Sequence, residues 1–212
     1  MRVEPGSAEP RRLILLRHGQ TSWNALRRVQ GQLDSELDDV GHRQAADVAT
    51  VLARRRPSVL WSSDSARARA TAAYVAKETG LDAVHDARLR EYFLADRQGL
   101  THTEYTALAP EEFARFRRGD FGVVPGGETA EQVSARVAAA VRDVLAQLAP
   151  GELAVVVSHG AAIRDAVPVL LGRPVARPAV LYGLDNCGWA ELDQADPSEP
   201  MRMSAYNRVA SS

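Results

Sequence analysis

Two short runs of apolar residues stand out from a chain in which apolar positions otherwise recur every three or four residues. Residues 13–16 and 153–157 are continuous apolar runs bounded by charged or polar residues, a pattern typical of fully buried strands. The three- to four-residue spacing elsewhere is typical of amphipathic helices. Strands that alternate with helices favour a mostly parallel sheet with helices on both faces. We therefore predict an α/β fold, a three-layer sandwich.

The other elements follow from the same patterns and from signals at their ends. Asp38 or Asp39 can cap the first helix, Gly80 closes the second, and Thr129 with Gln132 fits a capping box at the start of the third. The last two predicted strands are expected at the edges of the sheet. The predicted helices span about 39–56, 66–79, 129–148 and 161–171, and the further strands 58–62, 83–84, 189–192 and 201–204.

Both patterns fade in the middle of the chain, from Glu91 to Gly127. This interval is too long for an ordinary connection between elements. We therefore expect residues 92–127 to form an inserted lid over the carboxyl ends of the strands. Arg115, Arg117 and Arg118 within it either contact an acidic substrate or lie on a solvated helix face.

Composition limits the classes of partner. A chain of 212 residues can bury one sizeable core, and we expect a single domain over 12–212 after a disordered leader at 1–11. The formal net charge of −1 argues against a broad nucleic-acid or anionic-membrane surface, so any anion site must be local. No stretch approaches the roughly 18 apolar residues of a membrane span. The single cysteine, Cys187, fits a reducing compartment, so we expect a cytoplasmic protein. We expect its partner to be a small molecule.

Reactive side chains follow both strongly apolar strands directly. Arg17 and His18 come after the first strand, and His159 and Gly160 come after the second. Ligands of open α/β sheets bind outside the carboxyl ends of the strands, and Arg67 lies in the first turn of a predicted helix, where free N–H groups favour an anion. Guanidinium groups match phosphate oxygens, and a glycine lets a ligand approach the backbone closely. The sequence thus predicts a phosphate pocket.

Two other chemistries fit these residues less well. The sequence has no His-x-x-x-His pair and no cysteine cluster, and the flanking arginines would repel a cation, so we expect neither a metal nor another cofactor. A serine hydrolase would need a Gly-x-Ser-x-Gly elbow, which the sequence lacks. A single strand-end histidine could be a packed core residue, but two histidines with two arginines favour a site.

At these residues the sequence resembles the histidine phosphatase superfamily, in its phosphoglycerate-mutase-like branch. The opening motif at 17–24, Arg-His-Gly-Gln-Thr-Ser-Trp-Asn, carries most of the resemblance, which spans about 12–192. Further matching motifs follow in the family's order: Gln30-Gly31, Ser62-Ser63-Asp64, Arg67-Ala68, Leu89-Arg90-Glu91, Gly126-Gly127-Glu128 and Ser158-His159-Gly160.

The resemblance implies a role for each residue of the pocket. His18 would accept the phosphoryl group as a phosphohistidine, with Arg17, Arg67 and His159 around the phosphate, and Glu91 would donate a proton. Nearby cations would depress the pKa of His18 and keep a neutral, nucleophilic nitrogen. We expect the arginines and a charged His159 to replace the usual magnesium. The resemblance also implies substrate contacts at Asn24, Gln30 and Gly31.

Within the family, the pattern resembles phosphatases more than mutases, and most of all the actinobacterial glucosyl-3-phosphoglycerate phosphatases. Mutases usually have an asparagine where Ala161 stands and a longer basic insertion. Arg97 replaces a usual aromatic residue, and either reaches a carboxylate or second phosphate of the substrate or reshapes the rim. We expect a phosphatase of a small phosphomonoester, such as a sugar phosphate or phosphoglycerate, and a homodimer. A mutase and a non-catalytic regulator that binds a phosphometabolite remain alternatives.

Overall fold

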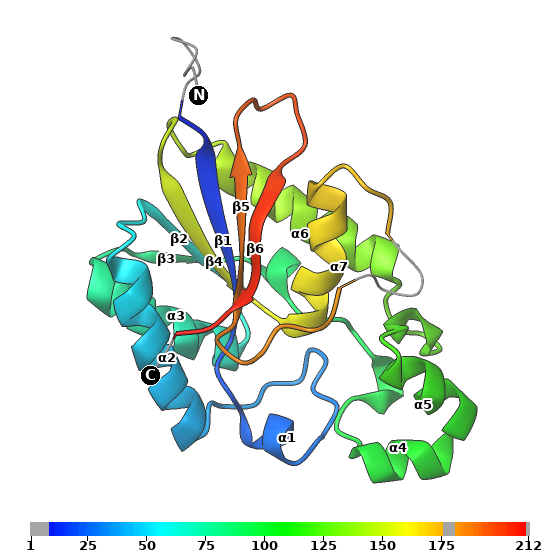
Figure 1. Cartoon of the computed structure of the whole chain (residues 1–212). Helices are drawn as coiled ribbons and strands as arrows, with labels where there is room; N and C mark the ends of the chain where they lie inside the picture. The colour runs from blue at the N-terminus through cyan, green and yellow to red at the C-terminus, as the bar shows by residue number, and fades with distance from the viewer. Residues whose placement is uncertain (1–8, 176–180, 211–212) are drawn as a thin grey trace.

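A six-stranded sheet lies at the centre of the computed structural model, which describes residues 9–175 and 181–210 (Figure 1). Its strand order is β3-β2-β4-β1-β5-β6. The first four strands in this order are parallel, and β5 and β6 are each antiparallel to the preceding strand. The strands span Arg11–Arg17 (β1), Val59–Ser62 (β2), Ala83–His85 (β3), Leu153–Ser158 (β4), Trp189–Gln194 (β5) and Arg202–Arg208 (β6).

Helices cover both faces of this sheet. On one face α2 and α3 pack over Ile14 and Leu16 of β1, and on the other α6 and α7 pack over Leu13 and Leu15 (Figure 1). Successive side chains of a strand point to opposite faces, so a strand buried on both sides must be apolar throughout. The predicted α/β sandwich is confirmed. These helices span Asp39–Ala53 (α2), Ala66–Thr79 (α3), Ala130–Leu145 (α6) and Gly160–Leu170 (α7).

The predicted helix caps agree with the structure, although α2 and α6 each end three residues earlier than predicted. The side chain of Asp38 accepts a hydrogen bond from the Gly41 backbone at the start of α2, and Thr129 forms the capping box at the start of α6. Gly80 ends α3 with φ of 74°, a left-handed conformation that suits glycine. None of the helices in the described part of the chain is long and apolar enough to cross a membrane.

Two predictions about the ends of the sheet were wrong. β5 is not an edge strand, because it pairs with β1 on one side and β6 on the other. Leu192 of β5 is buried and pairs with Leu13 of β1, as expected for a strand inside the sheet. Arg11, assigned to a disordered leader, is already part of β1, and its Nε donates to the Leu148 carbonyl. Residues 1–8 of that leader lie outside the described residues.

Short helices replace regular long elements between Glu91 and Gly127, which explains the faded periodicity. α4 and α5 stand apart from the sandwich, beside the carboxyl ends of the strands (Figure 1). Their aromatic side chains, with one from the following turn, pack with ring centroids 4.6 to 6.2 Å apart and join the core on the α6 and α7 face of the sheet. The short elements of the chain are α1 (Ser22–Ala25), α4 (His102–Leu108), α5 (Pro110–Arg117), and the 3₁₀ turns Ala87–Leu89, Ala95–Arg97 and Phe121–Val123.

Candidate active site

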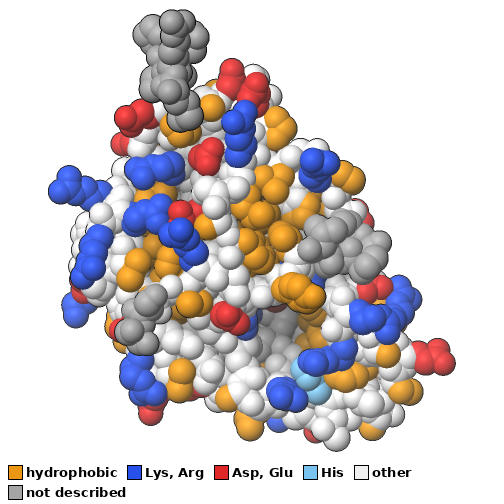
Figure 2. Space-filling model, in the orientation of Figure 1, with side chains coloured by type: hydrophobic (Ala, Val, Ile, Leu, Met, Phe, Trp, Pro, Cys, Tyr) orange, Lys and Arg blue, Asp and Glu red, His pale blue; other side chains and the backbone are white. Residues whose placement is uncertain are grey.

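A cavity of about 630 Å³ lies at the carboxyl end of β1. Basic side chains and a histidine gather around the hollow visible on the face in Figure 2. Arg17 pairs with Ser158 in the register of β1 and β4, so His18 and His159 follow at the same level. Their ring centroids are 5.2 Å apart in an edge-to-face arrangement. The sheet thereby brings together two histidines that are 141 positions apart in the sequence.

His18 is held as one tautomer by its two neighbours. Its Nδ1 lies 2.7 Å from the Gly19 carbonyl oxygen, which can only accept, so Nδ1 carries the proton. Its Nε2 accepts a hydrogen bond from Arg67 Nε at 3.2 Å. Burial, followed by the charges of Arg67 and Arg17, holds the pKa of His18 well below its usual value. At neutral pH the ring is uncharged, with a lone pair on Nε2.

Two arginines place positive charge near this ring: Arg67, which is buried, and Arg17, which is half-buried. Arg67 donates its other hydrogen bonds to the carbonyls of Leu33 and Gly31, and burial lowers its pKa to about 10, which leaves it charged at pH 7. Arg17 donates to the Leu184 carbonyl, whereas its buried Nε has no hydrogen-bond partner among the described residues. A buried N–H without a partner is costly, so this donor suits an incoming anion.

Gly160 packs closely against Arg17. A Cβ atom at Gly160 would lie 3.3 Å from Cδ and Nε of Arg17, tighter than most real contacts. The glycine leaves room for the arginine at the start of α7, and it lines the cavity as predicted.

His159 is fully buried beside His18 and is not itself among the described residues that line the cavity. Its Nε2 lies 3.0 Å from the Ser63 hydroxyl and 3.3 Å from that of Ser65, and its Nδ1 has no partner among the described residues. Burial, and then the charge of Arg67, holds its pKa well below the usual value. The expectation of a charged His159 was therefore wrong: its ring is neutral at pH 7, and the positive charge comes from the arginines.

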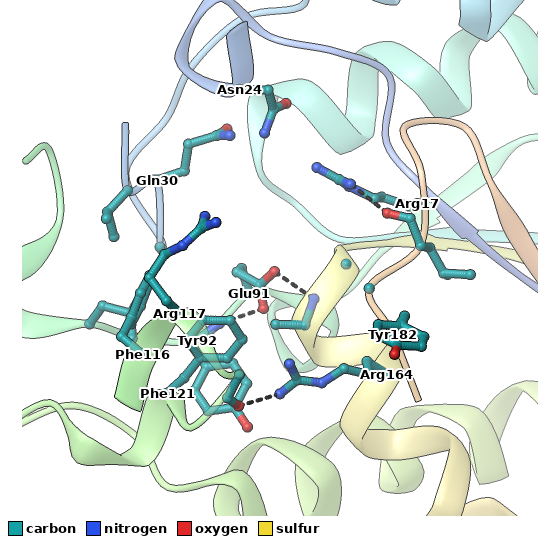
Figure 3. A pocket seen from close by; sticks show the side chains of 18 of the residues that line it. Arg17, Asn24, Gln30, Glu91, Tyr92, Phe116, Arg117, Phe121, Arg164 and Tyr182 are labelled. Atoms are coloured by element: carbon teal, nitrogen blue, oxygen red, sulfur yellow. Dashed lines mark hydrogen bonds between the residues drawn. The ribbon is translucent and has the colours of Figure 1, made fainter. Parts of the chain in front are cut away.

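Glu91 is the only carboxylate among the described residues that line the cavity. Its two oxygens accept hydrogen bonds from the backbone N–H groups of Ala161, at 3.1 Å, and Ala162, at 2.9 Å. Figure 3 shows the bond from Ala161. These N–H groups belong to the first turn of α7, where an anion is favoured. The helix that begins after His159 therefore also orients Glu91.

The other predicted contacts divide into those that line the cavity and one that does not. Asn24, Gln30 and Gly31 line it, and Figure 3 shows the side chains of Asn24 and Gln30 on its upper side. Arg97 is not among the lining residues. Its guanidinium forms an ion pair with Glu112 of α5, with Nε 2.8 Å from Oε1, so its charge is already neutralised. The expected contact between Arg97 and substrate is therefore not supported.

Other arginines take the place expected for Arg97. Arg117 and Arg118 line the cavity, and Figure 3 shows Arg117 pointing into it, whereas Arg115 is 2.7 Å from Asp120 in an ion pair. Arg164 lies one helical turn after Gly160 and so shares its face of α7, a spacing that could have revealed it from the sequence. The residues that sequence reasoning missed are Arg28, Tyr92, His102, Phe116, Phe121, Arg164 and Tyr182.

The cavity is strongly positive although the whole chain has a net charge of −1. Six arginines and the single carboxylate of Glu91 line its described part. Arg164 is neutralised by Asp165, with Nε 2.6 Å from Oδ1. The described residues contain no group of three or more histidine, cysteine or acidic side chains arranged to hold a metal ion. The site is built to bind an anion.

Residues 13–204 match the model of the histidine phosphatase superfamily (branch 1). The chain belongs to this family. It is 40% identical over 188 residues to the glucosyl-3-phosphoglycerate phosphatase of Mycolicibacterium vanbaalenii, covering 86% of this chain and 84% of the relative. It is 37% identical to a probable phosphoglycerate mutase of Shigella boydii, over 85% and 84% of the two chains. A solved structure, a mycobacterial glucosyl-3-phosphoglycerate phosphatase in complex with VO3, superposes with a TM-score of 0.85 at 38% identity, covering 93% and 99%. The predicted resemblance is confirmed.

The two buried histidines predict acid-sensitive stability. Both pKa values are lowered in the folded state, so below about pH 6.5 the unfolded chain binds protons that the folded chain excludes. The free energy of unfolding should fall as pH drops below 6.5, by up to about 1.4 kcal/mol per pH unit for each imidazole. Urea denaturation between pH 7.5 and 5.5 measures this slope. His159→Gln should reduce it, whereas the same change at exposed His85 should not. Equal slopes for wild type and His159→Gln would contradict the assignment.

Proposed function

We propose that this protein is a metal-independent phosphatase that hydrolyses a small phosphomonoester through a phosphohistidine at His18. The observation that carries this proposal is the neutral Nε2 of His18, which accepts a hydrogen bond from the buried Arg67, lies within the field of Arg17 and belongs to a cavity lined by arginines. Membership of the histidine phosphatase superfamily and the phosphatase relatives support phosphomonoester hydrolysis. The structural neighbour in complex with VO3 also supports phosphomonoester hydrolysis, because a vanadium oxyanion resembles a phosphoryl group.

In the first step, the lone pair on His18 Nε2 attacks phosphorus and the bond from phosphorus to the substrate's ester oxygen breaks. A bound phosphate takes over the hydrogen bond from Arg67 Nε, which frees that lone pair. Arg17 and Arg67 stabilise the charge on the three non-bridging oxygens, the largest contribution expected for phosphoryl transfer. Glu91 gives a proton to the departing oxygen, so the alcohol leaves neutral.

In the second step, water replaces the alcohol. Glu91, now deprotonated, takes a proton from the water as its oxygen attacks phosphorus. The bond from phosphorus to Nε2 breaks, the electron pair returns to the ring, and inorganic phosphate leaves. Each cycle therefore leaves His18 neutral and returns to Glu91 the proton that it donated, with no net electron transfer.

The width of the cavity indicates a substrate larger than phosphate. Its volume is typical of sites for whole small metabolites. Arg28, Arg117 and Arg118 line it in addition to the arginines beside His18, so a second anionic group on the substrate would be stabilised. Tyr182, almost fully exposed, provides an aromatic face at the rim. We therefore infer a phosphoglycerate-type ester or acidic sugar phosphate as the substrate class.

The lid, the oligomeric state and the location of the protein are further proposals. We infer that residues 92–127 act as a lid, because Phe116 and Arg117 of α5 and Phe121 beyond it line the cavity. A homodimer and a cytoplasmic location remain predictions. The first rests on the family resemblance and the second on the single cysteine, Cys187.

A phosphoglycerate mutase is the competing enzymatic function, favoured by the mutase relative. A mutase returns the phosphoryl group from His18 to the substrate before water reacts. Incubation of 3-phosphoglycerate with and without a bisphosphate primer distinguishes the two. The phosphatase proposal predicts release of phosphate without primer, and rapid primer-dependent isomerisation with negligible phosphate release would replace it.

Removal of the nucleophile tests the proposal directly. His18→Ala should lower kcat for phosphate release from a phosphomonoester panel by at least about a thousand-fold, because no other described side chain replaces Nε2. EDTA should leave wild-type activity unchanged. Near-normal activity of His18→Ala, or activity that EDTA removes and Mg²⁺ or Zn²⁺ restores, would refute the mechanism. A properly folded His18→Ala sample, checked by its circular dichroism, is the required control.

Loss of the proton donor should depend on the leaving group. Glu91→Gln should lower kcat by about 10²-fold or more for alkyl phosphates, which need protonation of the leaving oxygen. The loss should be much smaller for p-nitrophenyl phosphate, whose leaving group needs little protonation. Steady-state kinetics on both substrates measure the difference, and equal losses would remove Glu91 from this role.

The second anion contact can be separated from the phosphate contact. Arg117→Gln should raise KM about ten-fold for 3-phosphoglycerate but change KM little for glycerol phosphate, which lacks the carboxylate. Arg115→Gln is the matched control, because Arg115 lies on the same helix but pairs with Asp120. Similar effects of Arg117→Gln on both substrates would contradict a second anion contact.

A further inference from the structure

An arginine of α6 that does not line the cavity uses all of its hydrogen-bonding capacity around Glu91. Arg136 donates from Nε and Nη2 to the two carboxylate oxygens of Glu128, both at 2.8 Å. Its Nη1 donates to the carbonyls of Arg88, at 2.8 Å, and Arg90, at 2.6 Å, and Nη2 donates to the carbonyl of Glu91 at 2.9 Å. A guanidinium has five N–H donors, so every one is occupied.

The carboxylate of Glu128 extends these contacts to the other side of Glu91. It accepts a hydrogen bond from the Phe93 backbone N–H at 2.8 Å and another from the Gln32 amide at 3.4 Å. The same Gln32 amide is 3.1 Å from the Glu91 carbonyl. The ion pair of Arg136 and Glu128 therefore bonds to the chain both before and after Glu91.

Side-chain contacts also hold the neighbours of Glu91, because Arg90 pairs with Asp64, Tyr92 is buried and bonded to Asp165, and Leu94 is buried, but among the described residues only Arg136 and Gln32 bond to the Glu91 carbonyl. Residues 90–94 belong to no helix or strand, so no regular ladder of backbone bonds fixes them. The carboxylate of Glu91 is bound at the start of α7, but its backbone depends on Arg136 and Gln32. A misplacement of about 1 Å at a reacting group can cost about 10²-fold in rate.

We propose that Arg136, through its ion pair with Glu128, is a positioning residue that sets Glu91 for proton transfer to the leaving group. This inference rests on the proposed function, in which Glu91 is the proton donor. Arg136 does not touch the substrate and acts through the backbone on both sides of Glu91. Its guanidinium is required for its shape as well as its charge, because one ammonium group cannot reach the same five acceptors.

Two variants of Arg136 separate the shape of its side chain from its charge, a third variant is a matched control, and a fourth changes the ion-pair partner of Arg136. Arg136→Gln removes both, whereas Arg136→Lys keeps a charge that also helps to hold the pKa of His159 down. Arg55→Gln removes another two-point ion pair, between Arg55 and Glu191, at 2.9 and 3.0 Å. That pair joins the end of α2 to β5 and does not line the cavity. Glu128→Gln removes the negative charge that pairs with Arg136.

The readout is kcat for an alkyl phosphate against p-nitrophenyl phosphate, with thermal unfolding as a check on folding. Arg136→Gln and Arg136→Lys should each lower kcat for the alkyl substrate by 10- to 100-fold, roughly, and for the aryl substrate by less than about three-fold. Arg55→Gln should change neither by more than about two-fold. In the double variant, Arg136→Gln should add less than about three-fold to the loss caused by Glu91→Gln, because Arg136 acts only through the proton transfer that Glu91→Gln has already removed.

Equal losses on both substrates, full multiplication of the losses in the double variant, or complete rescue by Arg136→Lys would each overturn the proposal. If Arg136→Gln does not fold, Arg136→Lys and Glu128→Gln provide the same comparison of substrates. The role of Glu91 as proton donor and the role of Arg136 as positioning residue can be refuted separately. Glu91→Gln without leaving-group selectivity refutes the proton donor itself. If Glu91→Gln shows leaving-group selectivity but no variant of Arg136 or Glu128 does, only the role of Arg136 is refuted.

Discussion

The hydrogen bond from Arg67 to Nε2 of His18 is the interaction around which the site is organised. It places a buried cation against a buried neutral ring, and it fixes the nitrogen that keeps the lone pair. Burial of the cations beside His18 is stable only if their charge meets an acceptor, and backbone carbonyls supply part of that need. The Nε of Arg17 has no hydrogen-bond partner among the described residues, and a phosphate oxygen can accept its hydrogen bond.

The sheet supplies the geometry that this interaction needs. Because β1 and β4 are parallel neighbours in register, they end together and deliver His18 and His159 to one place. The helix that starts after His159 then binds the carboxylate of Glu91 with its free N–H groups. The positions of His18, Arg67 and Glu91 thus depend on strand pairing and helix ends, whereas the rim of the cavity depends on the short helices outside the sandwich.

The sequence predicted those parts of the site that local pattern determines. His18 and His159 follow continuous apolar runs, and Arg67 opens a helix, so their positions at strand and helix ends could be derived without the structure. Arg97 could not be placed correctly, since its partner Glu112 becomes a neighbour only when the lid folds. The charge of His159 was mispredicted because the degree of burial sets its pKa, and a lone sequence does not show that burial. The five contacts of Arg136 likewise join segments that are distant in sequence.

If His18 is the nucleophile, it should react through Nε2, and the nitrogen that carries the phosphoryl group can be identified experimentally. Wild-type protein can be quenched at high pH within milliseconds of mixing with substrate and its adduct assigned by ³¹P and ¹H NMR of the digested peptide. The structure predicts phosphorylation of His18 on Nε2, because Nδ1 is bound to the Gly19 carbonyl. A phosphoryl group on Nδ1, on another residue, or no adduct during rapid turnover would contradict the account.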